Sequence, residues 1–329
     1  GGVGYLRVMT KHFLLGAFTG LSLAAFSQIS VNHIDPFIGT GGHGHTHPAA
    51  TAPFGMVQIG PDTRREGWDG CSGYHFTDST VWGFSHTHLS GTGVGDYGDF
   101  LFKPWGGPFA DSPVAFDKSS ERASAGTYSV RLTNGTQAEF TAAERGGFHR
   151  YQYAEDQSPE LWIDLNYRDR VLRASARLEG SVLHLKRVSQ GWAKEQHAYL
   201  AVLLPVGATV DIVDSLQVRI SLPSRSAELA VGFSGTDGQG AQRNLRATLA
   251  SSRNFEGCAA RSSTLWQAEL DRAQVTGGSA AQKRIYATAL YHAFSVPNLW
   301  SDADGRYRGM DGRILVCEKI SVENGGSRS

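Results

Sequence analysis

The chain has 329 residues, in which 31 Lys plus Arg balance 31 Asp plus Glu, so its formal charge at pH 7 is zero. Nucleic-acid-binding proteins need a basic surface to displace counterions, and this balance argues against that class. The chain has 40 Gly and only 3 Met, a bias that argues against a helical bundle and favours a turn-rich β protein of about two domains.

The amino terminus has the order of a secretory signal. A lysine precedes the apolar run 13–26, and small residues follow the run. This is the pattern of a signal peptide, here from about Met9 to Ser27, so residues 1–27 are predicted to be upstream residues and a signal peptide. The apolar run is too short to span a bilayer. We therefore expect a periplasmic or secreted protein without a membrane span.

From Thr127 onward, short segments alternate apolar and polar residues between turn signals. A period of two buries one face of each strand, so two sheets must pack face to face or one sheet must close on itself. We expect a mainly β fold, with a β-sandwich over residues 28–261. The predicted strands cover residues 127–132, 148–153, 161–165, 182–188, 199–204, 216–222 and 229–233.

The pattern changes to helical near residue 262. Thr264 with Gln267 offers the capping pair that satisfies free amides at a helix start. Ser279 with Gln282 offers the same pair, so two helices are predicted. The second helix ends before Pro297 and has an apolar stripe that needs a packing partner. The stripe consists of Ile285, Leu290, Ala293 and Phe294.

Seven of the twelve His lie between residues 33 and 88. Histidines two apart, such as those at 43, 45 and 47 or at 86 and 88, point the same way on a strand and could hold a zinc ion. The supporting carboxylate of an HxHxD site and the HExxH helix are both absent from the sequence. Three interpretations stay open: hydrogen bonds that organise loops, direct contact with a polar ligand, and zinc ligation.

A tryptophan stands next to a carboxylate at Trp68 and Asp69. One face of a pyranose stacks on an indole, while a carboxylate fixes the sugar hydroxyls. Arg64 and Arg65, just upstream, could bind hydroxyls or hold Asp69 in place. The segment thus indicates a sugar site, and the alternative is a core tryptophan followed by a turn. Cys71 has no identifiable base to make it a nucleophile.

Two further stretches are rich in glycine or acidic residues. Residues 89–99 space glycines at 91, 93 and 95 but lack the lysine of a phosphate loop, so we expect close backbone packing beneath a site. Asp302, Asp304 and Asp311 resemble half of a calcium loop but lack its closing Glu. An EF-hand is therefore not expected.

Four motifs occur in order in the first hundred residues: DPFIGTGGHGHTHP at 35–48, PFGMVQ at 53–58, WDGCSGYH at 68–75 and GFSHTHLSGTG at 83–93. Others follow at 125–130, 147–151, 290–294 and 297–309. Together they resemble glycoside hydrolase family 92, the exo-acting α-mannosidases. The likeness extends from about Val31 to about Ile314.

The resemblance implies an amino-terminal β-sandwich followed by an (α/α)6 barrel, with the active site between them. It also implies calcium-dependent hydrolysis of α-mannosides with inversion, which needs a general acid and a general base. The family places both carboxyl groups, and most calcium ligands, in the barrel. Residues 262–314 are then a linker helix and the start of a truncated barrel, and residues 315–329 an unrelated tail. We expect no catalytic residue in this chain and no turnover by the chain alone.

The resemblance also implies which positions face the substrate. The expected partner is a mannose-containing glycan, such as an N-glycan or mannan, and a separate barrel polypeptide remains an open possibility. The rival hypotheses are a non-catalytic carbohydrate-binding sandwich module and a zinc hydrolase built on the His pairs. The positions matching substrate-facing motifs are Arg64, Trp68, Asp69, His86, His88 and Asp302.

Overall fold

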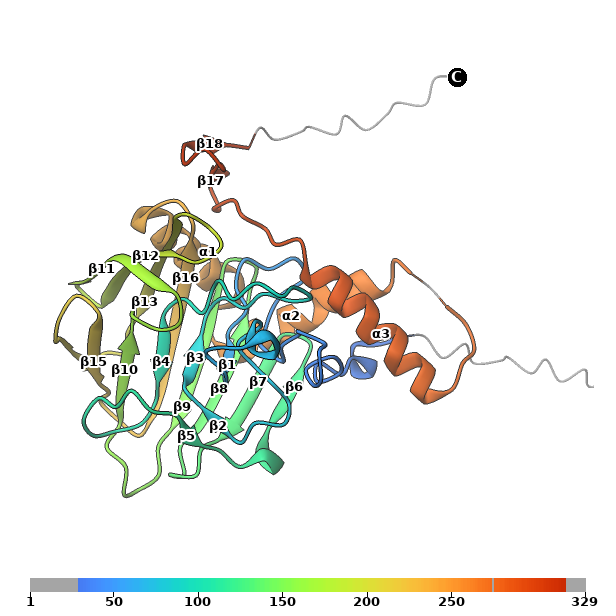
Figure 1. The fold of residues 1–329 in the computed structure, drawn as a ribbon, viewed down its shortest axis with the longest axis horizontal. Coiled ribbons are helices and arrows are strands. Elements are labelled where there is room, and N and C mark those ends of the chain that lie inside the picture. The colour runs from blue at the N-terminus through green and yellow to red at the C-terminus, as the bar shows by residue number, and fades with distance from the viewer. Residues whose placement is uncertain (1–28, 274, 318–329) are drawn as a thin grey trace, which may run out of the picture.

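The computed structural model describes residues 29–273 and 275–317. The predicted signal peptide lies outside the described residues. Two large sheets, of six and eight strands, pack face to face around one core (Figure 1). Three helices follow the last strand of the sandwich. The mainly β fold, a β-sandwich leading into helices, is therefore confirmed.

Each of the two large sheets contains only antiparallel pairs among the described strands. The six-stranded sheet has the order β1 (Gly60–Asp62), β3 (Gly83–Ser85), β4 (Leu101–Lys103), β10 (Glu160–Asp164), β15 (Gln217–Ser221) and β14 (Thr209–Ile212). The eight-stranded sheet has the order β11 (Arg170–Glu179), β12 (Val182–Gln190), β13 (Gln196–Leu203), β16 (Ser226–Ser234), β9 (Gly146–Gln152), β8 (Gln137–Ala142), β7 (Thr127–Arg131) and β6 (Arg122–Ser124).

Short elements fill the connections between these strands. The strand pair β2 (Thr80–Val81) and β5 (Val114–Ala115) forms a small sheet of its own. The 3-10 helices are η1 (Val31–His33), η2 (Trp68–Gly70) and η3 (Lys118–Ser120).

The core between the sheets follows from the alternation seen in the sequence. In β12, Leu183 and Leu185 are buried while the residues between and beside them are partly exposed. Large aromatic rings fill the middle of the layer, with Phe84 and Phe140 centred 4.7 Å apart. Apolar burial on this scale is the main stabilising contribution to the sandwich.

Three helices cover the outer face of the eight-stranded sheet and one end of the sandwich. They are α1 (Gly238–Ser252), α2 (Phe255–Leu270) and α3 (Ala280–Ser295). α1 lies on β13 and β16. The helices thus begin before residue 262, inside the range predicted to be sandwich, and α1 is a helix that the sequence analysis did not predict.

The cap at Ser279 is confirmed, whereas the cap at Thr264 is wrong. Ser279 accepts from the Gln282 amide, and the Gln282 side chain accepts from the Ser279 amide. Thr264 lies within α2, where its hydroxyl donates to the Ala260 carbonyl one turn earlier. The actual amino-terminal cap of α2 is Asn254, whose side chain accepts from the Gly257 amide at 2.9 Å.

α3 packs through a different face from the predicted stripe. Ile285 is 62% exposed, and Ala293 is also exposed. The buried positions of α3 are Ala287, Thr288, Tyr291 and Ser295. Leu290 and Phe294 pack at the edge of this face, against a cluster that includes Ile29, Ile34, Trp266 and Leu270.

The described chain ends in a hairpin of β17 (Arg306–Arg308) and β18 (Ile314–Val316), which projects from the sandwich beside α1 (Figure 1). Arg306 ties the hairpin to Asp237 at the start of α1, with 2.7 Å between Nη1 and Oδ2. Among the residues that the structure describes, no helix is both long and apolar enough to cross a bilayer.

Candidate functional site

Trp68, Asp69, His43 and His45 form a partly exposed group that we call the platform. Trp68 opens η2 and is 63% exposed, so it is not the core residue of the alternative interpretation. The edge of the His45 ring meets the indole, with 4.7 Å between ring centres and 76° between planes. An exposed indole held by a neighbouring ring offers a flat apolar face to a ligand.

Asp69 provides the charge on the platform. Its Oδ1 lies 2.7 Å from Nδ1 of His43 and 3.4 Å from Nε2 of His45. The hydrogen bond from His43 lowers the pKa of the Asp69 carboxyl, and both imidazoles favour its ionised form. Asp69 is therefore an ionised hydrogen-bond acceptor at neutral pH, next to the indole.

The glycine-rich loop at residues 91–98 supports the platform from beneath. The Cys71 thiol donates to the Thr92 carbonyl at 2.7 Å, which ties the platform segment to this loop. A Cβ added to Gly93 would lie 2.2 Å from Cζ3 of Trp68. The expectation of close backbone packing under a site therefore agrees with the geometry, because only glycine lets the indole lie this close.

Replacing Gly93 with alanine is expected to displace the Trp68 indole without unfolding the protein. The added methyl overlaps the ring, and the ring is exposed enough to move away. We expect the binding of a sugar probe at the platform to weaken at least tenfold, while the free energy of unfolding changes by less than about 1 kcal/mol. Gly95→Ala is the matched control, because its Cβ meets only Nη2 of Arg168, at 3.9 Å. Equal affinities in the two variants would contradict this prediction.

Arg168 is a positioning residue that the sequence analysis missed. Its Nη2 donates to the carbonyls of Gly70 and Cys71 at 2.7 and 2.6 Å, and its Nε donates to the Gly95 carbonyl at 3.0 Å. One nearly buried guanidinium thus joins the platform segment to the glycine-rich loop. The only signal in the sequence is its place just after the predicted strand 161–165.

Arg64 lies beside the platform segment but has a structural partner. Its Nε and Nη2 donate to both carboxylate oxygens of Asp78 at distances of 2.9–3.2 Å. This two-pronged ion pair gives the guanidinium a structural partner other than Asp69. Contact between Arg64 and a substrate stays a prediction.

The ring of His86, predicted to face the substrate, is fully buried in the sandwich core, and its contact with substrate stays a prediction. Nδ1 of His86 lies 3.0 Å from the Phe100 carbonyl, so Nδ1 is the donor. Nε2 of His86 then accepts from Nε2 of His149 at 3.1 Å. Nδ1 of His149 in turn accepts from the Tyr151 hydroxyl at 2.8 Å. This network assigns both rings as neutral.

Acid is expected to destabilise the protein through these two histidines. Burial lowers the pKa of His86 to about 4 and also lowers the pKa of His149, whereas an unfolded histidine binds a proton near pH 6.5. The unfolded state therefore binds more protons as the pH falls from 6.5 towards 4, and the free energy of unfolding falls in that window. Urea unfolding at pH 7 and pH 5 measures this change. His149→Phe should lose less stability than the wild type between these pH values, and an equal loss would contradict the assignment.

His88 is also buried, and its direct contact with substrate stays a prediction. Its Nδ1 donates to the Gln58 carbonyl at 2.9 Å, and its Nε2 lies 3.3 Å from Oδ2 of Asp62. Asp62 accepts from the Ser85 amide at 3.1 Å. His88 therefore acts within the sandwich, where it fixes the strand ends beneath the platform.

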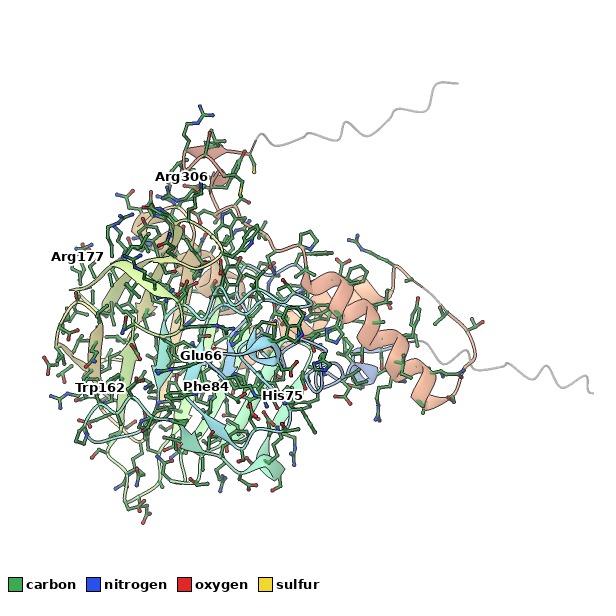
Figure 2. All side chains as sticks on the ribbon, in the orientation of Figure 1. Glu66, His75, Phe84, Trp162, Arg177 and Arg306 are labelled. Carbon is green, nitrogen blue, oxygen red and sulfur yellow. The ribbon has the colours of Figure 1, made fainter. Side chains whose placement is uncertain are left out.

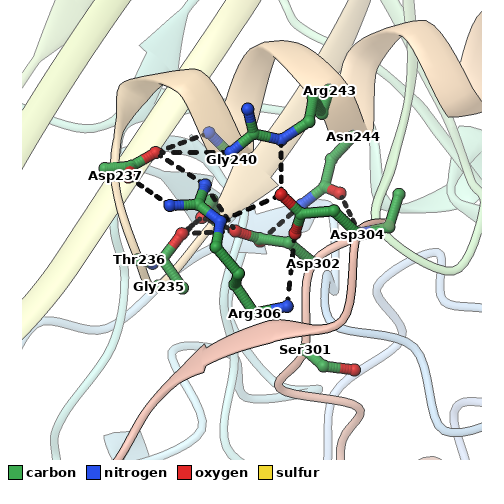
Figure 3. Close-up of polar contacts among 12 residues, drawn as sticks. Gly235, Thr236, Asp237, Gly240, Arg243, Asn244, Ser301, Asp302, Asp304 and Arg306 are labelled. Carbon is green, nitrogen blue, oxygen red and sulfur yellow. Dashed lines mark hydrogen bonds and ion pairs between the residues drawn. The ribbon is translucent and has the colours of Figure 1, made fainter. Parts of the chain in front are cut away.

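Asp302 does not lie among the platform residues either. Its carboxylate is buried at the start of α1, where it accepts from Ser234, Thr236 and Asn244 (Figure 3). Burial raises the pKa of Asp302, and these hydrogen bonds oppose that effect. Its observed role is to fix the segment after α3 to the sandwich, and its contact with substrate stays a prediction.

The described residues do not fit a metal centre. Within 29–273 and 275–317 there is no group of three or more His, Cys, Asp or Glu side chains that could hold an ion. Asp304 pairs with Arg243 and Arg306, and Asp311 pairs with Arg313. The zinc hypothesis on the His pairs therefore lacks a site in this part of the chain. The calcium implied by the resemblance likewise has no cradle here, and no step below depends on it.

Comparison with known families gives two matches. Residues 33–208, more than half of the chain, match the glycosyl hydrolase family 92 N-terminal domain. Residues 240–324 match the glycosyl hydrolase family 92 catalytic domain, so this likeness runs past Ile314, where the sequence analysis ended it. The fold and both matches point to one family of glycosyl hydrolases. The chain belongs to glycosyl hydrolase family 92.

Solved structures agree with this assignment. A family GH92 α-mannosidase from Bacteroides thetaiotaomicron superposes with a TM-score of 0.80 at 27% identity, over 88% of this chain and 44% of that one. A structure described as an inverting family GH92 mannosidase from the same bacterium has a TM-score of 0.75 at 21% identity, over 87% and 43% of the two chains, and shows the shared fold. The chain thus spans less than half the length of these relatives.

A further relative is a protein of Arthroderma benhamiae described as an uncharacterized secreted glycosidase. It is 27% identical over 190 residues, which cover 52% of this chain and 24% of that protein.

Proposed function

We propose that this chain supplies the glycan-binding amino-terminal part of a secreted, inverting exo-α-mannosidase. The observation that carries the proposal is the exposed Trp68 indole beside the ionised Asp69 carboxylate. Family membership supports the glycosidase class. The relatives described as α-mannosidases support the substrate class, and the relative described as secreted supports export.

On the platform, the apolar face of a mannose ring stacks on Trp68, and Asp69 accepts a hydrogen bond from a sugar hydroxyl. The hydrogen bond from His43 orients the Asp69 carboxylate for this role. Arg168 fixes the segment that carries the indole, and Gly93 allows the indole to pack closely against the loop. The natural ligand is a mannose-containing glycan such as an N-glycan or mannan.

Inversion requires a general acid and a general base about 6.5–9.5 Å apart, with water between them. Asp69 is the one carboxylate on the platform. We place the acid, the base and the calcium in the helical domain that faces the platform, on the same polypeptide or a separate one. Losing a general acid or base lowers a rate by about 10² to 10⁴ each, so the 329-residue chain alone is expected to show no measurable turnover.

Two measurements test the proposal. Hydrolysis of an aryl α-mannoside with calcium present should show no turnover by the purified chain, and clear turnover would overturn our placement of the carboxyl groups. Calorimetry with mannose should show binding that weakens at least tenfold in Trp68→Ala, about 1.4 kcal/mol. Trp192→Ala, at another exposed tryptophan, is the matched control. Equal heats in both variants would exclude stacking on Trp68.

A non-catalytic carbohydrate-binding module is the second candidate, favoured by the fact that the whole platform lies on the sandwich and not on α1 to α3. Adding a purified helical domain from a family 92 relative separates the two. Restored turnover supports the mannosidase, whereas unchanged binding without turnover supports the module.

A further inference from the structure

A second polar pocket lies beside the platform, with a volume of about 280 Å³. It opens where β10 ends and β15 begins, next to the start of the platform segment. Glu66, at its rim, stands two residues before Trp68 and is labelled in Figure 2. Residues that line it include Arg65, Phe109, Asp164, Asn166, Arg168 and Gln217.

Asp164 is the buried acceptor of this pocket. It ends β10 and is 4% exposed, and its Oδ1 accepts from the Asn166 amide at 2.8 Å. No other hydrogen bond to this carboxylate is found within the described part of the chain. Lys103 on the adjacent strand β4 lies nearby, but its Nζ donates to the Ala110 carbonyl at 2.9 Å. The carboxylate thus has acceptor capacity left for a ligand.

The charges that line the pocket are of both signs. Arg65 pairs with Asp111, with 3.0 Å between Nη1 and Oδ2, and its guanidinium lies 3.8 Å above the Trp82 ring. The cationic Arg168 and the acidic Asp164 and Glu66 also lie on the lining. An anionic ligand would be repelled by the carboxylates of the lining, and a cationic ligand would be repelled by its guanidiniums. The lining therefore suits an uncharged ligand that both donates and accepts hydrogen bonds.

The volume of the pocket and the apolar residues of its lining limit the class of ligand further. Phe109 and Leu216 supply apolar surface, against which the C–H face of a sugar ring can pack. The volume of about 280 Å³ is just below the ~300 Å³ at which ligand pockets usually begin. The pocket has room for one ring and not for an extended chain.

We propose that this pocket is a second sugar-binding site, which takes one uncharged hexose unit with a hydroxyl donated to Asp164. Arg168 links it to the platform, because the same side chain lines the pocket and holds the carbonyls of Gly70 and Cys71. The proposal takes its ligand class, a hexose, from the proposed function, but it does not require stacking on Trp68.

Calorimetry and saturation-transfer NMR with D-mannose test the proposal on four forms of the full chain: wild type, Trp68→Ala, Asp164→Asn and the double variant. Asp164→Asn keeps the size of the side chain and removes an acceptor charge. We expect Trp68→Ala to keep one binding event and the double variant to bind at least tenfold more weakly than Trp68→Ala. Asp156→Asn, at an exposed loop aspartate, is the matched control.

The outcomes separate this site from the platform. If Trp68→Ala binds as well as wild type while Asp164→Asn does not, the platform fails and the pocket stands. If Trp68→Ala binds no mannose, or if the folded double variant binds as well as Trp68→Ala, the pocket is not a sugar site. Should Asp164→Asn lose the far-UV signal of the wild type, Asn166→Ala repeats the test, because that side chain is exposed.

Discussion

Replacing Arg187 with alanine is expected to lower the free energy of unfolding by about 3–5 kcal/mol, the loss typical of breaking a buried ion pair from one side. Arg187 is fully buried in the sandwich, and its Nη1 lies 2.7 Å from Oδ1 of Asp99. Its Nη2 bonds to Asp169 and to the Tyr167 carbonyl. Without the guanidinium, two carboxylates lose their counter-charge, and the loops on which the platform rests lose a common anchor.

Urea unfolding followed by far-UV circular dichroism measures this effect. Arg173→Ala is the matched control, since Arg173 on the neighbouring strand β11 pairs with Glu195 at the surface, where such pairs are worth about 0–1 kcal/mol. A loss below about 1 kcal/mol for Arg187→Ala would show that Asp99 and Asp169 find other partners.

Trp266→Ala is expected to cost about 3–5 kcal/mol and to release α3 from the sandwich. Trp266 on α2 is fully buried, and its Nε1 donates to the Thr51 carbonyl at 2.8 Å. Its ring lies 4.5 Å from the Tyr291 ring of α3. Removing the indole leaves a cavity where α2, α3 and the sandwich meet.

Two readings together check this prediction. The urea midpoint should fall, and limited proteolysis should cut faster around residues 275–279, the stretch that leads into α3. Trp192→Ala is the control, because that ring is 80% exposed and surface substitutions usually change stability by less than about 0.5 kcal/mol. Unchanged cleavage in Trp266→Ala would mean that α3 is held by other contacts.

The strands were predictable where burial imposed a period of two. The segments at 161–165 and 182–188 lie in β10 and β12, whose alternate side chains fill the core. β11 escaped prediction because it lies at a sheet edge, where only the small side chains of Ala174 and Ala176 pack against the core and most other side chains are exposed. Nothing buried imposes a pattern on it.

The helices were predictable only where a cap was explicit. Ser279 and Gln282 form the reciprocal cap that the sequence indicates. α1 begins with Gly238-Gln-Gly240, which reads as a turn, and Asp237 caps it by accepting from the Gly240 amide at 2.7 Å. Its apolar positions are few, since much of its buried face is small or polar, including Asn244 and Thr248.

For the site, the sequence showed which segments matter but not the role of each side chain. Trp68 is exposed next to a partly exposed Asp69, whereas His86 and Asp302 from equally distinctive motifs are buried. A sequence motif can contain side chains that hydrogen-bond within the core as well as side chains that contact a ligand. The motif alone does not distinguish the two roles. The neutral pairing of His86 with His149 joins residues that are 63 positions apart, and no local pattern reveals it.

The side chain of Gln267 binds both sides of the Ile29–Val31 segment, because Oε1 accepts from the Val31 amide and Nε2 donates to the Ile29 carbonyl. These partners are 236 and 238 residues apart. At about 5–20 residues per second, a ribosome delivers Gln267 roughly 10–50 s after Val31. During synthesis, the segment that emerges early therefore cannot form these two hydrogen bonds until Gln267 has followed it.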